Sequence, residues 1–408
     1  MTFPNFHTTL EVELTMTRPA LFASLLLGLL GCLAPARAEW SLTNAEFNTE
    51  KKITVNEWSL KDGLSYTAEN GKLAQCPTRQ MTLLANDRPP IPPSPADASW
   101  QLLLKNGDLI QGEPVALHEQ LLQFKTSELE TIDVPLKLIA ALQAKAAKNL
   151  PALPKAAERD SVRFKSGDTL DGLFVSLADA QIKMQSDLGE STIPLENVDR
   201  LSLGGTLLPR ILPPLSVRIT FSSGSVLTTK NFTWTIAQIT LKDYADQDRK
   251  CSPEQIASIQ VLGGRVVWLT ELDPSKEETS SFLGTQFPVQ INRNVLGGPL
   301  KIARTSFDRG LGVHTASRLT YDLDGSFNTF SLRAGLDDSA LPHGQANLAI
   351  LLDAKTLWSI TAMKAGQLSE PLLLPLTDGH KLELLATSPE KLDVLGRVNW
   401  VNPALIRP

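Results

Sequence analysis

Cysteine and histidine are scarce in this chain. Its 408 residues include 3 Cys and 5 His, and no two histidines stand at metal-ligand spacing. Patterns for nucleophilic, metal and phosphate chemistry are also missing: there is no Gly-x-Ser-x-Gly, His-Glu-x-x-His, P-loop or Cys-x-x-Cys. A disulfide-framed scaffold is excluded, although Cys76 and Cys251 could form one bridge or stay as two buried thiols. We therefore expect no catalytic residues and no enzyme.

Charge of one sign and aromatic side chains are sparse as well. The net charge is −5, with Lys and Arg scattered, and aromatic residues make up 6% of the chain. A basic footprint for nucleic acid or for an anionic membrane is therefore lacking, and we expect no nucleic-acid partner.

One long apolar run lies near the N-terminus. Arg18 precedes apolar residues 20–33, and Ala36-Arg37-Ala38 follows with the small residues that a signal peptidase reads. The run has about 14 residues, fewer than the roughly 20 of a bilayer span. We expect residues 1–38 to hold an upstream segment and a signal peptide from about residue 16, leaving no transmembrane span after cleavage. Lipoprotein processing at Cys32 is the alternative, and either route predicts a secreted, periplasmic or cell-envelope protein.

An internal repeat occupies the middle of the chain. Leu104–Gly112 recurs as Phe164–Gly172 and more loosely as Phe221–Leu227, and each copy is followed by a proline and an apolar set. The alternation of apolar residues predicts a strand, a glycine turn, a bent strand and further strands ending near the proline. This layout is typical of small antiparallel barrels of the SH3-like or Sm-like sort.

The repeats suggest a string of domains. Cys76 and Cys251 stand at equivalent places before the last strand of their units, which indicates a degenerate unit ahead of the clear ones. Proline-rich joints between units are semi-rigid spacers. We expect a degenerate barrel unit at 39–87, a Pro-rich linker at 88–99, barrel repeats at 100–145, 159–205 and 215–269, and a separate domain at 270–408.

The C-terminal region is predicted to be a β-sandwich. Leu319, Tyr321 and Leu323 alternate with polar residues, and Asp324-Gly325 is a hairpin signal. Short strands with turns between them and no helix period are typical of such a fold. The whole chain is therefore expected to be all-β.

Motifs in this region carry a family resemblance. They run in order through Phe307–His314, Ser317–Phe330, Arg333–Asp338, Leu351–Lys355 and Asn399–Pro403. The segments resemble the NPCBM family of carbohydrate-binding modules. The resemblance implies a galactose-binding-like jelly-roll sandwich that binds a glycan or polysaccharide reversibly. Ala354 stands where the family tends to have the glycine of Asp-Gly-Lys, so we expect that turn to be reshaped.

A sugar site needs planar or charged hydrogen-bonding side chains beside an apolar ring face. The candidate carbohydrate-binding residues are His314, Arg333, Asp337, Asp338, His343 and Trp358. Structural roles are alternatives: His314 could be a hydrogen-bonded structural histidine, Trp400 could belong to the core, and Asp337 could cap a turn or hold a structural calcium ion. No other cofactor is expected.

The sequence therefore predicts a secreted, non-catalytic carbohydrate-binding protein. One alternative is a structural or adhesive envelope protein that binds protein partners through its repeats. Another is a glycoside hydrolase, which needs two carboxyl groups across a cleft. A concave patch with exposed Trp or His on the sandwich favours sugar, whereas a flat apolar patch on the barrels favours protein partners.

Overall fold

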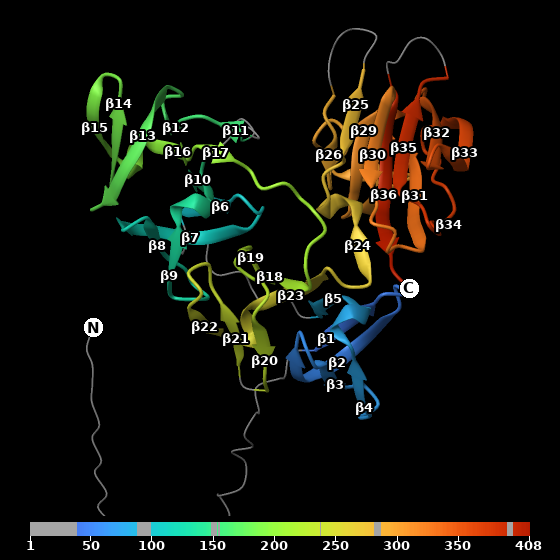
Figure 1. The fold of residues 1–408 in the computed structure, drawn as a ribbon, viewed down its shortest axis with the longest axis horizontal. Coiled ribbons are helices and arrows are strands. Elements are labelled where there is room, and N and C mark those ends of the chain that lie inside the picture. Colours follow the sequence, from blue (N-terminus) through green and yellow to red (C-terminus); the bar gives the residue numbers. More distant parts are fainter. Residues whose placement is uncertain are drawn as a thin grey trace, which may run out of the picture. The chain divides into compact units, whose positions relative to one another are not determined.

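The computed structural model describes residues 39–87, 99–147, 153, 156–236, 238–280, 287–389 and 395–408. Strands, turns and short 3₁₀ helices make up these residues, which include no α-helix (Figure 1). The predicted all-β fold class is therefore confirmed. Within the same ranges, no helix is long and apolar enough to cross a membrane. The predicted signal peptide lies outside the described residues.

The first three units share one order of elements. The first unit contains β1 (Trp40–Asn44), β2 (Thr49–Ser59), β3 (Gly63–Thr67), β4 (Leu73–Cys76), η1 (Thr78–Gln80) and β5 (Met81–Asn86). The second contains β6 (Trp100–Leu104), β7 (Leu109–His118), β8 (Leu121–Lys125), β9 (Thr131–Pro135), η3 (Leu136–Leu138) and β10 (Ile139–Ala144). The third contains β12 (Asp160–Phe164), β13 (Thr169–Ala178), β14 (Gln181–Ser186), β15 (Gly189–Pro194), η4 (Leu195–Asn197) and β16 (Val198–Ser202), with a two-stranded accessory sheet of β11 (Ala156–Ala157) and β17 (Gly205–Thr206).

The fourth unit follows the same order with its second strand divided. It contains β18 (Ser216–Phe221), β19 (Val226–Thr229), β20 (Phe232–Trp234), β21 (Ile239–Lys242), β22 (Asp248–Cys251), η5 (Pro253–Gln255) and β23 (Ile256–Leu262). The repeated 3₁₀ turn before the last strand accounts for the repeated proline seen in the sequence. The likeness of these units to SH3-like barrels stays a prediction.

The repeated glycine of the second strand allows a close approach of two strands. A side-chain carbon at Gly112 would lie 2.1 Å from the Lys125 carbonyl oxygen, and one at Gly172 would lie 2.5 Å from the Gln185 carbonyl oxygen. The strand register shifts just beyond both glycines, in β7 and in β13. Because only glycine fits there, the strand can bend and pair first with one neighbour and then with the next.

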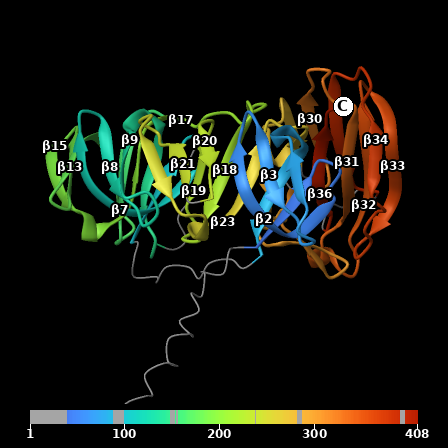
Figure 2. The same ribbon diagram turned by 90° about the horizontal axis from the view of Figure 1, so that it is seen from below.

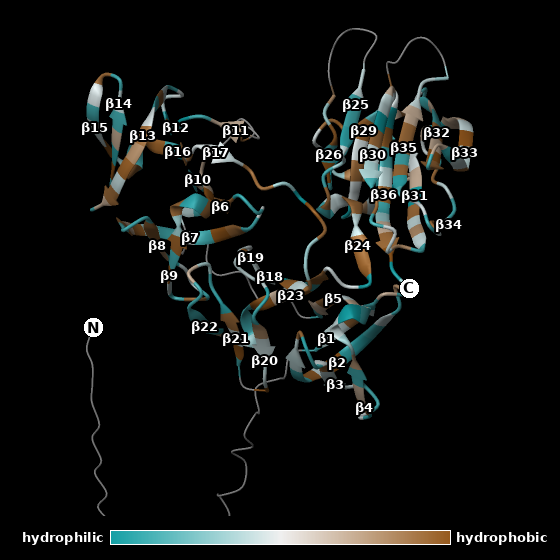
Figure 3. Cartoon of the chain, viewed as in Figure 1, coloured by the Kyte–Doolittle hydropathy of each residue, from teal (hydrophilic) through white to brown (hydrophobic). Residues whose placement is uncertain are grey.

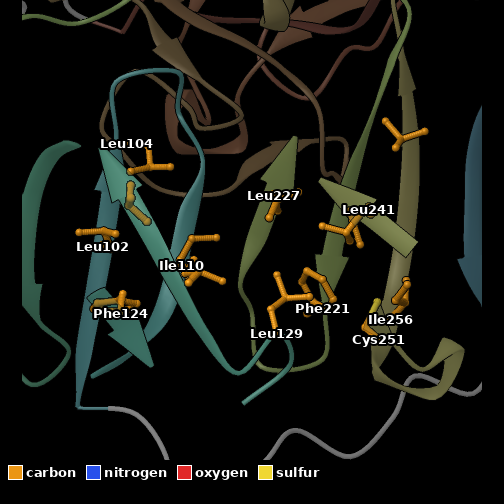
Figure 4. Close-up of a cluster of buried hydrophobic side chains, with 14 of the residues drawn as sticks. Leu102, Leu104, Ile110, Phe124, Leu129, Phe221, Leu227, Leu241, Cys251 and Ile256 are labelled. Atoms are coloured by element: carbon orange, nitrogen blue, oxygen red, sulfur yellow. The ribbon is translucent and has the colours of Figure 1, made fainter. Parts of the chain in front are cut away.

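The four units join edge to edge and share one apolar core. Strand β5 pairs with β23, β19 pairs with β7, and β10 pairs with β16. Figure 4 shows side chains of the second and fourth units in one buried cluster, including Leu104, Ile110, Phe221 and Leu227. Hydrophilic and hydrophobic residues are mixed along many of the strands (Figure 3), as expected where one face is buried.

A buried carboxylate fastens the second unit to the fourth. Asp108, in the glycine turn before β7, is only 1% exposed. It accepts hydrogen bonds from the Thr228 backbone N–H (2.8 Å), the Thr228 hydroxyl (2.7 Å) and the Tyr244 hydroxyl (2.8 Å). In the third unit the equivalent Asp168 is exposed and contacts Ser166 of its own turn. The same motif is therefore a joint in one unit and a surface turn in another.

The two cysteines described are free thiols. Cys76 is half-buried at the end of β4, and Cys251 is buried at the end of β22. Of the two alternatives, the structure therefore shows separate thiols at one repeated structural position.

The C-terminal region folds as a sandwich of two antiparallel sheets (Figures 1 and 2). One sheet has the order β26 (Gln290–Ile291), β29 (Gly310–His314), β36 (Arg397–Ile406), β31 (Thr329–Leu336) and β34 (Leu372–Pro375), with β24 (Val266–Trp268) also on β36. The other has the order β25 (Lys276–Thr279), β30 (Ser317–Asp322), β35 (Lys381–Thr387), β32 (Gln345–Leu352) and β33 (Lys355–Lys364). A hairpin of β27 (Leu300–Ile302) and β28 (Thr305–Phe307) and the 3₁₀ helices η6 (Leu269–Glu271) and η7 (Asp338–Ala340) complete it. Trp400 is fully buried in the core between the sheets, the structural role that the sequence suggested for it.

The sandwich begins slightly earlier than expected. Strand β24 pairs with β36, so residues 266–268 belong to the sandwich sheet rather than to the fourth unit. The first unit contacts this region, since Phe47 packs against Trp268 with ring centroids 5.7 Å apart, and Glu46 forms an ion pair with Arg265.

Candidate functional site

Asp337 is a buried latch at the end of β31. Its side chain is 1% exposed, and its oxygens accept four hydrogen bonds. Oδ1 accepts from the Asn294 amide (3.1 Å) and the Ser339 backbone N–H (3.0 Å). Oδ2 accepts from the Asn399 amide (2.7 Å) and the Lys301 backbone N–H (3.2 Å). These donors stabilise the buried carboxylate, so Asp337 holds together the segments that donate to it.

The latch fixes a hairpin on the outer face of the sheet that holds β31. Asp337 binds the first strand of the β27–β28 hairpin through Lys301, and Ile302 of that strand covers Gly335. A side-chain carbon at Gly335 would lie 2.5 Å from the Gln367 carbonyl oxygen and 2.8 Å from the Ile302 side chain, so both segments lie this close because the residue is glycine. The position of the hairpin is therefore set by buried contacts.

Asp338, Arg304 and His343 are presented by these fixed loops, and we refer to them as the loop-end site. Asp338 is half-buried, and its Oδ2 accepts from the Arg304 backbone N–H (2.9 Å). Its Oδ1 is buried without a hydrogen-bond partner among the described residues. The side chains of Arg304 and His343 are exposed, and His343 lies in the tight turn that follows η7.

His314 is the last residue of β29, in the sheet that also holds β31. It is buried, and its ring stacks on Phe287 with centroids 4.5 Å apart and planes 15° apart. In the sheet it is the register partner of Arg397, whose guanidinium donates to the Ser339 carbonyl oxygen (2.6 Å). The loop that carries Asp338 is thereby fastened from a second side.

The remaining predicted residues lie farther away. Arg333 is half-buried on β31 and donates from Nε to the Ser369 carbonyl oxygen (2.9 Å). Trp358 is half-buried on β33, in the other sheet, and packs against the sandwich core. The structure thus gathers Asp337, Asp338 and His343 around one turn, and it does not bring Trp358 to them.

Sequence reasoning missed Arg304, Asn294 and Asn399. The turn at Ala303 and Arg304 has φ of 51° and 65°, a conformation that usually calls for glycine or asparagine. Nothing in the sequence marks that turn, and the two asparagines reach Asp337 only through tertiary contacts.

The calcium alternative stays a prediction. Both oxygens of Asp337 accept from N–H groups, as in a carboxylate held by the protein alone. Over the ranges that the structure describes, no group of three or more His, Cys, Asp or Glu side chains could hold a metal ion.

Residues 265–406 match the NPCBM/NEW2 domain, a carbohydrate-binding-like domain. This part of the chain is therefore a domain of that class, as its motifs predicted. A protein of Renibacterium salmoninarum named as an endo-alpha-N-acetylgalactosaminidase is 31% identical over 88 residues, which are 22% of this chain and 6% of that protein. The match thus spans only a small part of the relative's length.

Among solved structures, the chain is similar to carbohydrate-binding modules of family CBM51. One is from a Clostridium perfringens GH95 protein in complex with methyl-galactose, with 18% identity, a TM-score of 0.32, and coverage of 34% of this chain and 99% of the module. Another is a tandem pair of such modules from a family 98 glycoside hydrolase of Streptococcus pneumoniae, with 11% identity, a TM-score of 0.31, and coverage of 90% and 88%.

Proposed function

We propose that this protein is a non-catalytic carbohydrate-binding protein that attaches to a glycan through its C-terminal sandwich. The NPCBM/NEW2 match over residues 265–406 is the observation that carries the proposal. The loop-end site supplies the contacts: the Asp338 carboxylate as acceptor, the Arg304 guanidinium as donor and the planar His343 ring. Sugar hydroxyls both donate and accept, so they suit such a mixed surface.

The loop-end site is also prepared for binding. Asp337 and Arg397 fasten the loops from inside, so little conformational freedom is lost when a ligand arrives. Leu341, exposed by 51%, follows η7 in the same loop and offers an apolar contact for the C–H face of a sugar ring.

Attachment rather than hydrolysis is supported by the different roles of the paired carboxylates. Hydrolysis by two carboxyl groups needs both to face the substrate across a cleft, about 5 to 10 Å apart. Asp337 is buried and held by four N–H donors, so it does not face a substrate beside Asp338. The relative that is named as a glycosidase matches this chain over only 6% of its own length.

A glycan array probed with the full chain tests this function. We expect binding to a subset of glycans that weakens about tenfold or more in Asp338→Asn and in His343→Ala, because a hydrogen bond to a charged or planar group is lost. Asp324→Asn, an exposed carboxylate before the start of β31, is the matched control and should bind normally. Blank arrays from the folded chain would contradict the proposal.

Export is part of the same proposal. The apolar run at residues 20–33 and the small residues before Glu39 support a cleaved signal peptide. Sequencing the N-terminus of the protein recovered outside the cytoplasm should give Glu39. A lipidated Cys32 would establish the lipoprotein route, and an unprocessed cytoplasmic chain would contradict export.

Protein binding through the third unit is a second candidate function. Leu173 and Val175 on β13 are exposed by 62% and 44%, and Leu188 in the β14–β15 turn is exposed by 96%. Apolar side chains left in water on one strand support a protein contact. Cross-linking in cell-envelope extracts should yield an adduct with the native chain that disappears in the double variant Leu173→Ser, Val175→Ser. An adduct unchanged by these substitutions would contradict it.

A further inference from the structure

The second sheet of the sandwich carries an open depression of about 650 Å³. None of its lining residues belongs to the loop-end site. The lining comes from both ends of β30, the turn between β32 and β33, and the start of β35. Its polar members are Arg318, Asp322, Asp353, His380, Lys381 and Glu383, and its apolar members are Leu323 and Ala354.

The turn that borders the depression is clamped to the neighbouring strand. The Asp353 carboxylate accepts from the backbone N–H of His380 (3.2 Å) and of Lys381 (2.9 Å). The Asp353 backbone N–H donates to the Lys381 carbonyl oxygen (2.9 Å), and the Leu323 backbone N–H donates to the His380 carbonyl oxygen (2.7 Å). Three chain segments are thereby joined around one hollow.

The opposite wall is an ion pair between adjacent strands. Arg318 on β30 contacts Glu383 on β35, with Nη1 and Oε1 3.2 Å apart. Glu383 is mostly buried, whereas the Arg318 side chain is 44% exposed and its guanidinium carries further N–H donors. The neighbouring Leu382 and Leu384 are fully buried in the core, so this wall stands on a rigid strand.

We propose that this depression is a second saccharide site, which takes a neutral oligosaccharide segment of about two or three rings. Its volume lies within the roughly 300–1,000 Å³ of small-molecule sites. The lining combines donors (Arg318, Lys381) with acceptors (Asp322, Asp353), which suits hydroxyl groups that both donate and accept. The exposed Ala354 gives an apolar contact for the ring.

Charge selects against an acidic sugar. The carboxylates of Asp322, Asp353 and Glu383 outnumber the cations of Arg318 and Lys381 when His380 is neutral. A sialylated or uronic segment would bring a further negative charge against this surplus, and like charges at close range repel. An apolar ligand would leave the same polar groups without water or partners. A neutral saccharide avoids both costs.

The inference rests on the proposed function and extends it, because the sandwich would then hold two sugars at separate sites. The test uses the full chain on an array in which each neutral glycan stands beside its sialylated counterpart. Calorimetry with a neutral glycan that binds on the array then measures how many glycan molecules bind to each chain. Asp322→Asn and Lys381→Ala alter exposed depression residues, Asp338→Asn alters the loop-end site, and Ser359→Ala on β33 is the control.

The expected result is two glycans bound per chain, one lost in Asp322→Asn and in Lys381→Ala, the other lost in Asp338→Asn. Each affected site should weaken about tenfold or more, and the depression-dependent signal should favour the neutral partner of each pair. If one glycan binds per chain and only Asp338→Asn abolishes this binding, the depression is not a saccharide site, whereas the proposed function stands. Depression-dependent binding that is equal for both partners overturns the ligand class. No binding by the folded native chain overturns both proposals.

Discussion

Adjacent residues in this chain have opposite roles. Asp337 and Asp338 look alike in sequence, and both were candidates for sugar binding. In the fold Asp337 is 1% exposed with four donors, whereas Asp338 is half-buried and one of its oxygens has no hydrogen-bond partner in the described part of the chain. The sequence could place an acidic pair after a strand, but the burial of one member depends on Asn294 and Asn399, which are distant along the chain.

The first prediction concerns this pair. Asp337→Ala removes the acceptor of four hydrogen bonds in a buried place, so it should lower the free energy of unfolding by about 3 kcal/mol. Asp338→Ala should cost about 1 kcal/mol or less. Urea unfolding followed by tryptophan fluorescence measures both. Equal costs would show that Asp337 does not act as a latch.

The second prediction concerns Ala354. Ala354 stands where the family tends to have a glycine, and Asp353 and Ala354 form a two-residue turn with φ of 48° and 66°. Because a left-handed backbone strains alanine, Ala354→Gly should raise the free energy of unfolding by about 1 kcal/mol. Ala349→Gly, within β32, is the control and should lower it by about 1 kcal/mol. A destabilising Ala354→Gly would contradict the strained turn.

The third prediction concerns the thiols. Burial raises the pKa of Cys251 to about 12, and burial also raises the pKa of Cys76 above its ordinary value. Both stay protonated near neutral pH, and the thiolate is the reactive form. A thiol reagent at pH 8 should therefore label folded protein slowly, with the half-buried Cys76 reacting before Cys251, and should label both quickly in denaturant. Rapid labelling of Cys251 in the folded chain would be the opposite result.

At the scale of elements, one turn motif has different roles in different units. The Gly-Asp turn was predicted from sequence in both the second and the third unit, and strands flank it in both. Only Asp108 is buried, because Thr228 and Tyr244 of the fourth unit supply donors to it. Asp168 has no such partner among the described residues. The repeat therefore predicted the local structure but not which turn becomes a joint.

The fourth prediction follows from Tyr244 in this joint. Burial, and then the charge of Asp108, raise the pKa of Tyr244 well above its ordinary value of 10. Because the pKa of Tyr244 is higher in the folded state than in the unfolded state, the stabilisation that protonated Tyr244 provides is complete below about pH 10. This stabilisation is lost as pH rises further. Tyr244→Phe should cost about 1 kcal/mol at neutral pH through the lost hydrogen bond. Above pH 10 the gap between native and variant chains should shrink.

Unfolding curves collected from pH 7 to high pH measure this difference. Tyr66 and Tyr321 also have pKa values raised mainly by burial, so both chains should lose stability in alkali. The comparison isolates Tyr244, because Tyr66 and Tyr321 are common to both. A gap that widens above pH 10 would contradict the joint.

At the scale of the whole molecule, the all-β class and the NPCBM-type sandwich were predictable. Alternation, turn signals and ordered motifs carry that information locally along the chain. The polar depression was not predictable, because Arg318 lies on β30, Glu383 on β35 and Asp353 in the turn after β32, and the sheet order β30, β35, β32 differs from the chain order. Of the candidate sugar residues, only those close to one turn came together.

The most direct test of the account is a hydrogen-exchange map of the full chain with and without a glycan identified on the array. We expect slower exchange confined to residues 265–406, strongest at the turn after η7 and around the β32–β33 turn, and unchanged exchange in the four N-terminal units. Protection in those units with none in the sandwich would contradict the claim that the C-terminal domain holds the sugar.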